Sequence, residues 1–133
     1  MSTGYIYGNR IGYTGVGMRT SEALYSAVKY GDVPNALFNN NAEVPKAIED
    51  FKEVAFELAP EAIPNRLSSY FKLEGINAIK ASLIQNGPVI FSMPWYSDIY
   101  LKNGIMQHRA NCTVIDGYHC MVIYGWNKDG WKI

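Results

Sequence analysis

The clearest repeat of apolar positions lies shortly before the middle of the chain, where residues step by three and four: Ile48, Phe51, Ala55 and Leu58. Charged residues fill the positions between them, which is the pattern of an amphipathic helix with one buried face. Pro45 suits the first turn of this helix, because a first-turn residue needs no N–H partner. Pro60 and Pro64 are expected to stop it.

Two further segments show helical spacing. Thr20 or Ser21 can cap a helix over residues 20–31, and Gly31 is expected to end it in a left-handed conformation. A second helix is predicted where three apolar residues recur at Ile76, Ile79 and Leu83, and the pair at residues 86–87, Asn-Gly, closes it.

Three segments favour strands. Residues 67–73 alternate in part and carry two aromatic rings, so we predict a strand there. Pro88 precedes a second strand over residues 89–93, and its continuous apolar run indicates burial on both faces. Residues 119–126 form a longer apolar run, which we interpret as a central strand that begins at His119.

Shorter elements are expected around these strands. Residues 98–101 suggest a short turn of helix, and Gly104 opens a short strand. Asn127, Asp129 and Gly130 predict a hairpin turn, after which residues 131–133 begin the returning strand. Because the sequence stops inside that strand, we expect the domain to continue beyond it. Residues 5–10 fit no element clearly.

Composition and charge narrow the classes of function. Apolar residues make up 48% of the 133-residue chain, which suits one folded domain rather than a disordered segment. Formal net charge is zero and no block of like charge stands out, so neither a nucleic-acid surface nor a membrane-surface role is expected. No apolar run approaches the ~20 residues that cross a bilayer, and the first residues lack a signal-peptide core.

The chain has two cysteines, Cys112 and Cys120. A hairpin could bring them together as a disulfide, but two reduced thiols in a reducing compartment are the favoured interpretation. Their spacing from the histidines is not that of a zinc site, so no metal is expected.

Only two histidines are present, and they differ in context. His108 lies in a polar connection, where a solvated loop residue is expected. His119 starts an apolar run, where it is either a core residue with satisfied ring nitrogens or a general base held by the strand. Taken alone, the structural role is favoured. Similarly, Trp95 and Trp126 could wall a cleft, although large aromatic residues more often fill a core.

The neighbourhood of His119 changes this weighting. Residues 117–126 read GYHCMVIYGW and are followed, after the turn, by Trp-Lys-Ile. Upstream, residues 86–92 read NGPVIFS, residues 102–105 read KNGI, and residues 15–18 read GVGM before Ala-Leu and Tyr-Gly at residues 23–24 and 30–31. In kind and in order, these segments resemble the papain-like cysteine peptidases. The small number of cysteines suggests a bacterial or phage-type branch.

The resemblance implies an α+β fold, with part of a helical half and most of an antiparallel β-barrel-like half facing across a cleft. It also implies a mechanism in which a cysteine thiolate attacks the peptide carbonyl while a histidine carries the proton. His119 takes the histidine's catalytic role in this resemblance. Gly17 would offer backbone hydrogen bonds to an extended substrate, and Met18, Ser92 and Cys120 would line a substrate pocket. Loop and core packing is an equally good interpretation of each of these four residues.

The family's other catalytic groups have no match in residues 1–133. The nucleophilic cysteine segment would precede the chain, and an Asn-Ser-Trp-Gly segment would follow it. Cys120 cannot readily replace the nucleophile, since neighbours in a strand point to opposite faces. Cys112 is expected to be a structural or surface thiol.

We therefore expect an incomplete cysteine endopeptidase domain, truncated at both ends and inactive alone. Its expected partners are an extended peptide or protein substrate and a complementary segment that carries the nucleophile, with no cofactor. A non-catalytic peptide-binding module and a structural or assembly domain remain as alternatives.

Overall fold

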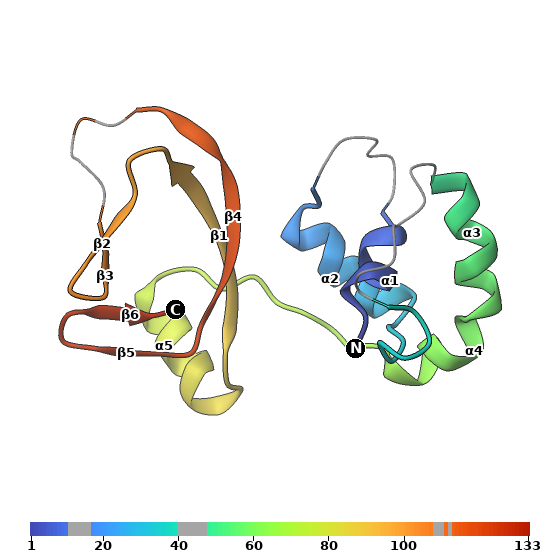
Figure 1. The fold of residues 1–133 in the computed structure, drawn as a ribbon. Helices are drawn as coiled ribbons and strands as arrows, with labels where there is room; N and C mark the ends of the chain where they lie inside the picture. Colours follow the sequence, from blue (N-terminus) through green and yellow to red (C-terminus); the bar gives the residue numbers. More distant parts are fainter. Residues whose placement is uncertain (11–16, 40–47, 108–110, 112) are drawn as a thin grey trace. The chain divides into compact units, whose positions relative to one another are not determined.

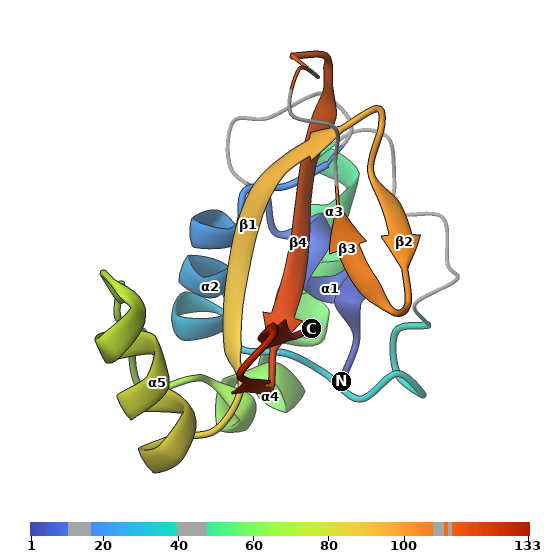
Figure 2. The ribbon, with the colours of Figure 1, turned by 90° about the vertical axis from the view of Figure 1, so that its left-hand side faces the viewer.

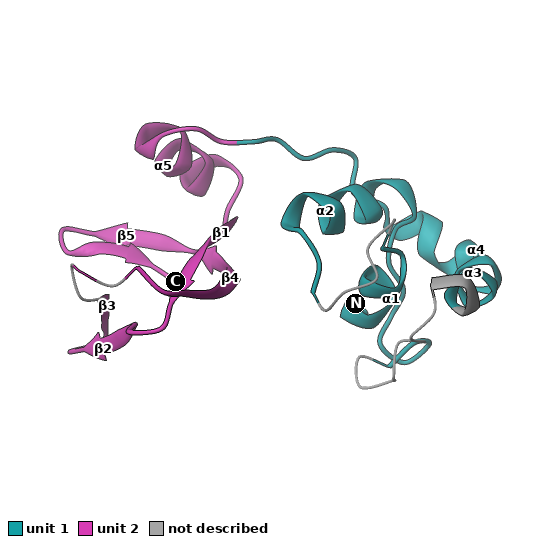
Figure 3. Ribbon diagram, turned by 90° about the horizontal axis from the view of Figure 1, so that it is seen from above, with its two compact units in different colours: residues 1–72 teal, residues 73–133 magenta. Residues whose placement is uncertain are grey.

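The computed structural model describes residues 1–10, 17–39, 48–107, 111 and 113–133. The chain divides into two compact units, Met1–Lys72 and Leu73–Ile133, which Figure 3 shows in different colours. The first unit is helical and the second holds one helix and all the described strands (Figure 1). The predicted α+β class is thus confirmed.

The helical unit contains α1 (Thr3–Gly8), α2 (Thr20–Lys29), α3 (Ile48–Glu57), α4 (Ala59–Ala62) and the 3₁₀ helix η1 (Ile63–Asn65). Its core is formed by Tyr5, Val33, Phe51 and Ala62. The rings of Tyr5 and Phe51 meet edge to face with centroids 5.7 Å apart, and Phe38 packs edge-on against both. This aromatic cluster ties α1 to α3 and to the loop that follows α2.

Helix α1 occupies a segment that sequence patterning left unassigned. The Ser2 hydroxyl caps it by accepting the N–H of Tyr5 at 3.1 Å, and Tyr5 is then fully buried. A six-residue helix is too short to show apolar periodicity, so its stability depends on this cap and on the buried ring.

The ends of the other helices differ in detail from the expectations. The N-cap of α2 is Arg19, with no side-chain cap bond, rather than Thr20 or Ser21. Helix α3 ends at Glu57, before Pro60, as predicted. Pro60 and Pro64 nevertheless each stand at the first turn of a new short helix, α4 and η1, where a proline needs no N–H partner.

The strand predicted over residues 67–73 is wrong. These residues form no helix or strand, and most of their side chains are exposed, including Phe71 at 82%. The backbone N–H and C=O groups of a strand must form hydrogen bonds to a neighbouring strand. Aromatic residues favour a strand locally, but they do not ensure that such a neighbour exists.

The second unit contains α5 (Ile76–Gln85), as predicted, and the strands β1 (Val89–Tyr96), β2 (Tyr100–Lys102), β3 (Ile105–Gln107), β4 (Ile115–Ile123), β5 (Gly125–Asn127) and β6 (Gly130–Lys132). These strands form three antiparallel pairs: β1 with β4, β2 with β3, and β5 with β6. Figure 2 shows β1 and β4 running side by side with the β2–β3 hairpin next to them. No closed barrel forms among the described residues, so the expected barrel-like half is corrected to three separate strand pairs.

Two strand expectations also change. Strand β1 is not buried on both faces, because half-buried and exposed residues alternate along its first half, with Ile90 at 47% exposure. Residues 98–101 do not form a helical turn; a backbone turn at Ser97 and Asp98 leads into β2 instead.

The predicted hairpin after β5 is confirmed. The Asn127 side-chain oxygen accepts the backbone N–H groups of Asp129 and Gly130 at 2.9 and 3.1 Å, which fixes the turn between β5 and β6. Across the described ranges, no helix has the length and apolar character needed to span a bilayer.

Candidate functional site

His119 lies inside β4, which begins at Ile115, and not at the start of a strand. Its neighbour across the β1–β4 pair is Met93, and the His119 side chain is exposed. The imidazole ring meets the indole of Trp95 edge to face, with ring centroids 4.9 Å apart and an interplanar angle of 65°. His119 is therefore reachable from solvent, but one side of its ring is in contact with an aromatic neighbour.

Cys120 is directed to the other face of the same strand. Successive residues of a strand point to opposite sides, and Cys120 stands opposite Ser92 whereas His119 stands opposite Met93. Both Ser92 and Cys120 are exposed. The strand pair thus brings together two of the predicted substrate-binding residues on one face, and separates the Cys120 sulfur from the His119 imidazole.

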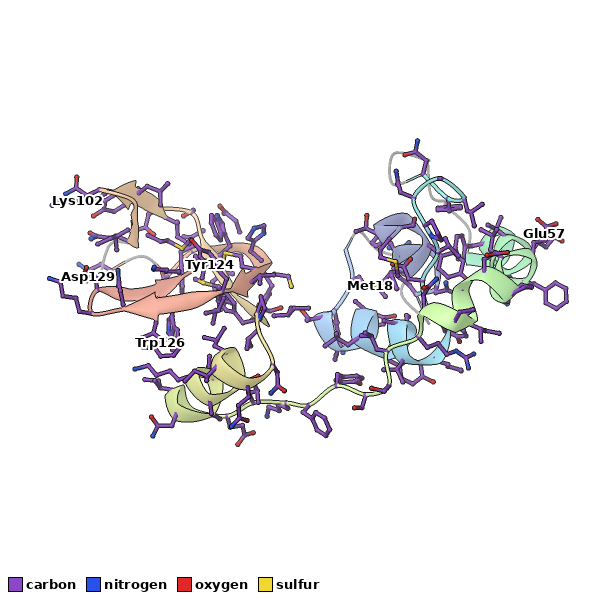
Figure 4. The ribbon with its side chains drawn as sticks, turned by 90° about the horizontal axis from the view of Figure 1, so that it is seen from below. Met18, Glu57, Lys102, Tyr124, Trp126 and Asp129 are labelled. Atoms are coloured by element: carbon purple, nitrogen blue, oxygen red, sulfur yellow. The ribbon has the colours of Figure 1, made fainter. Side chains whose placement is uncertain are left out.

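Gly17 and Met18 belong to the helical unit, just before α2, and Figure 4 labels Met18. The backbone of Gly17 is held by two side chains, one in α1 and one just after that helix. Its N–H donates to the Tyr7 hydroxyl at 3.0 Å, and its carbonyl accepts from Arg10 Nη1 at 3.2 Å. The Arg10 guanidinium also stacks on the Tyr7 ring, 3.8 Å from its centroid.

This arrangement limits what Gly17 can offer to a ligand. An amide has one hydrogen to donate, and the Gly17 hydrogen is directed at Tyr7, whereas its carbonyl oxygen has a second lone pair beyond the bond from Arg10. Sequence patterning gave no indication of Tyr7 and Arg10, because an aromatic and a basic residue in an unassigned segment carry no recognisable spacing.

The described residues place each half of the predicted site within its own unit. Gly17 and Met18 lie in Met1–Lys72, and His119, Ser92 and Cys120 lie in Leu73–Ile133. The cleft between the two halves stays a prediction. His108 and Cys112 fall outside the described residues.

A groove of about 830 Å³ lies within the second unit, between the two short hairpins and β4. Its apolar lining includes Leu101, Ile105, Met106, Met121, Trp131 and Ile133. None of the predicted site residues lines it. A smaller hollow lies beside α5, where the Lys80 ammonium stands 5.4 Å from the Trp126 ring centroid; Figure 4 shows Trp126 pointing from its hairpin toward that helix.

No group of three or more histidine, cysteine, aspartate or glutamate side chains in the described part of the chain comes close enough to hold a metal ion. The chemical groups that the described geometry brings to this strand are an exposed imidazole with an adjacent indole, and a thiol on the reverse face.

Comparison with known proteins adds a partial similarity. The chain is 34% identical over 70 residues to two proteins of Haemonchus contortus, cathepsin B-like cysteine proteinase 1 and cathepsin B-like cysteine proteinase 2. The alignment covers 49% of this chain but only 20% of each relative, so the chain matches about a fifth of their length. No family model matches the chain, and no solved structure matches it.

These relatives agree with the papain-like resemblance at the level of the family. They do not extend it to an activity of this chain, because most of each relative lies outside the aligned region. Both come from Haemonchus contortus, so they give no support to a bacterial or phage-type branch.

Proposed function

We propose that this chain carries the histidine-bearing part of a papain-like cysteine peptidase, which hydrolyses peptide bonds once a nucleophilic cysteine is supplied from outside residues 1–133. The observation that carries the proposal is the exposed imidazole of His119 within the segment 117–126, which resembles the family's histidine strand. The 34% identity to two cathepsin B-like proteinases supports the same family.

The proposed chemistry gives His119 two tasks. It first takes the proton of the attacking thiol, so that the thiolate can add to the peptide carbonyl and form a thioester as the C–N bond breaks. It then gives that proton to the departing amine. Water later attacks the thioester and regenerates the thiol. An exposed side chain on a rigid strand suits this role, because both the sulfur and the leaving group must reach one ring.

Cys120 does not serve as the nucleophile in this proposal. It points to the face of β4 opposite His119, so a thiolate there could not share a proton with the imidazole. Instead, Cys120 and Ser92 offer a small exposed surface for a substrate side chain within the second unit.

A complementation experiment tests the proposal. This chain is expressed together with the neighbouring part of its gene that encodes a papain-like cysteine segment, and the product is treated with a thiol-reactive peptide inhibitor. We expect labelling of that cysteine. Substitution His119→Ala should slow the labelling by about 10²–10⁴-fold, because the general base is lost. Substitution Cys120→Ser is the control: the inhibitor should still label the supplied cysteine.

The 133-residue chain alone should cleave no peptide. A gene without a cysteine segment, or a complemented protein that resists labelling, would refute the peptidase proposal.

One observation favours a second candidate, a peptide-binding module without catalysis. The face of the β1–β4 pair that carries Cys120 also carries three exposed apolar side chains, Ile90, Tyr118 and Val122. For this candidate, the 133-residue chain should bind an extended apolar peptide in a calorimetric titration, and His119→Ala should leave the affinity unchanged.

A further inference from the structure

We infer that Trp95 is a positioning residue for His119: its indole fixes the orientation in which the imidazole is presented. This inference rests on the proposed function for its catalytic consequence, but the ring contact itself is a property of the described second unit. The sequence alone suggested Trp95 as a cleft wall or a core residue, and gave no sign of a contact with His119.

The contact follows from the register of the strand pair. Trp95 stands opposite Gly117 and Met93 stands opposite His119, so the indole and the imidazole are diagonal neighbours on one face of the sheet. Diagonal partners on a strand pair are within reach when one side chain is large and aromatic. The observed centroid separation of 4.9 Å and angle of 65° are those of an edge-to-face aromatic pair.

Two local features direct the indole toward His119. The residue opposite Trp95 is a glycine, which offers no side chain to pack against; a Cβ added at Gly117 would meet no atom within 4 Å. The register also shifts between Trp95 and Tyr96, and such a bulge re-aims the side chain beside it. Trp95 is half-buried, so its ring is a firmer support than a fully solvated side chain would be.

The consequence for catalysis concerns the direction of the ring nitrogens. An exposed histidine on a strand would exchange between side-chain rotamers, and only some of them would present a nitrogen to an incoming sulfur. The indole lies against one side of the imidazole and disfavours rotation toward that side, while the solvent side of the ring stays accessible. Proton transfer would then start from an oriented ring, which reduces the reorganisation it requires.

Nuclear magnetic resonance of the 133-residue chain tests the contact directly. We expect nuclear Overhauser contacts between the Trp95 indole protons and the His119 ring protons. We also expect ring-current displacement of the His119 signals, which are assigned with a His108→Gln variant. Trp95→Ala should move those signals to the positions of an unconstrained histidine, and Trp95→Phe should retain part of the displacement. Trp126→Ala, which removes the indole that lies beside Lys80 of α5, is the matched control and should leave the displacement in place.

Retained amide protection in β1 and β4 must accompany each variant, so that loss of the signal reports the contact and not unfolding. If the Trp95→Ala signals stay where they are in the parent chain, the inference is overturned.

The catalytic consequence is measured on the complemented peptidase. Trp95→Ala should lower kcat by roughly 10-fold while KM stays within about twofold, and Trp95→Phe should recover most of the rate. If Trp95→Ala leaves kcat unchanged, Trp95 does not position His119 for catalysis, even where the ring contact is present. A complemented protein that is inactive in every variant would instead defeat the peptidase proposal, while the magnetic resonance result still decides whether Trp95 orients the ring.

Discussion

At the scale of single residues, Asp32 shows how burial and hydrogen bonding act against each other on one carboxylate. Its Oδ1 accepts the backbone N–H groups of Val33 at 2.8 Å and of Ser2 at 3.2 Å, and the residue is only 8% exposed. Burial raises the pKa of Asp32 above its ordinary value of 3.8, and the bonds from Val33 and Ser2 and the N-terminal amine lower it in part. The net direction is upward, so the charged form is disfavoured in the folded unit.

This direction fixes the sign of the pH dependence. A group whose pKa is raised on folding stabilises the fold most below its unfolded pKa, here about 3.8, and loses that contribution as pH rises through the raised value. We predict that Asp32→Asn, which keeps an oxygen acceptor for both N–H groups, raises the free energy of unfolding at pH 7 by no more than about 1 kcal/mol. It should also flatten the pH dependence above pH 3.8, the ordinary pKa of the group.

Urea unfolding followed by far-ultraviolet circular dichroism, repeated across pH, measures both effects. Asp129→Asn is the control, because the Asp129 carboxylate forms a surface ion pair with the exposed Lys128 at 3.7 Å and such pairs contribute little. A loss of stability in Asp32→Asn at pH 7 would show that the ionised carboxylate is net favourable.

At the scale of elements, α2 and α5 end in the same way, but the atoms around the two helix ends differ. Each helix is followed by a glycine with positive φ, Gly31 at 81° after α2 and Gly87 at 93° after α5. A side chain at either position is strained by this backbone conformation. The neighbours differ: a Cβ at Gly31 would overlap the carbonyl oxygen of Ala62, whereas one at Gly87 would meet no atom within 4 Å.

The pair therefore separates backbone strain from packing. We predict that Gly87→Ala lowers the free energy of unfolding by about 1–2 kcal/mol, the cost of the left-handed conformation alone. Gly31→Ala should cost a further ~1–3 kcal/mol, because α4 must move away from the end of α2. Urea denaturation of the two variants measures the difference, and equal losses would mean that the Gly31–Ala62 approach is not tight in solution.

At the scale of the whole molecule, the two units differ in how well their apolar residues are covered. The core cluster of the helical unit contains four fully buried apolar residues. Among the described residues of the second unit, Ile123 is the one buried apolar side chain, and several large apolar residues are strongly exposed, including Leu101 at 71% and Tyr118 at 77%. Since apolar burial is the main source of stability, the second unit should be the weaker one.

The tryptophans make this expectation measurable. Trp95, Trp126 and Trp131 all lie in the second unit, whereas most of the helix lies in the first. We predict two transitions in urea, with tryptophan fluorescence changing at a lower concentration than the helical circular dichroism signal. Coincident curves would mean that the units unfold as one cooperative structure.

The local sequence pattern was sufficient to predict an element where that element is stabilised by residues within the same segment. The stepping of Ile48, Phe51 and Ala55 correctly indicated α3, and the side chain of Asn127 defined the last hairpin. The same kind of pattern failed for residues 67–73 because alternation shows that a segment could pair, not that a partner strand exists.

For the candidate site, the sequence supplied the residue types, and the tertiary structure decided their neighbours. That His119 and Cys120 point to opposite faces follows from the two-residue period of a strand, and the sequence alone is enough to predict it. The pairing of β4 with β1, by contrast, joins residues that are 19 to 34 positions apart in the sequence. The register of this pair places Trp95 against the imidazole and Ser92 beside Cys120. A register is defined by two strands together, so neither segment read by itself could show these neighbours.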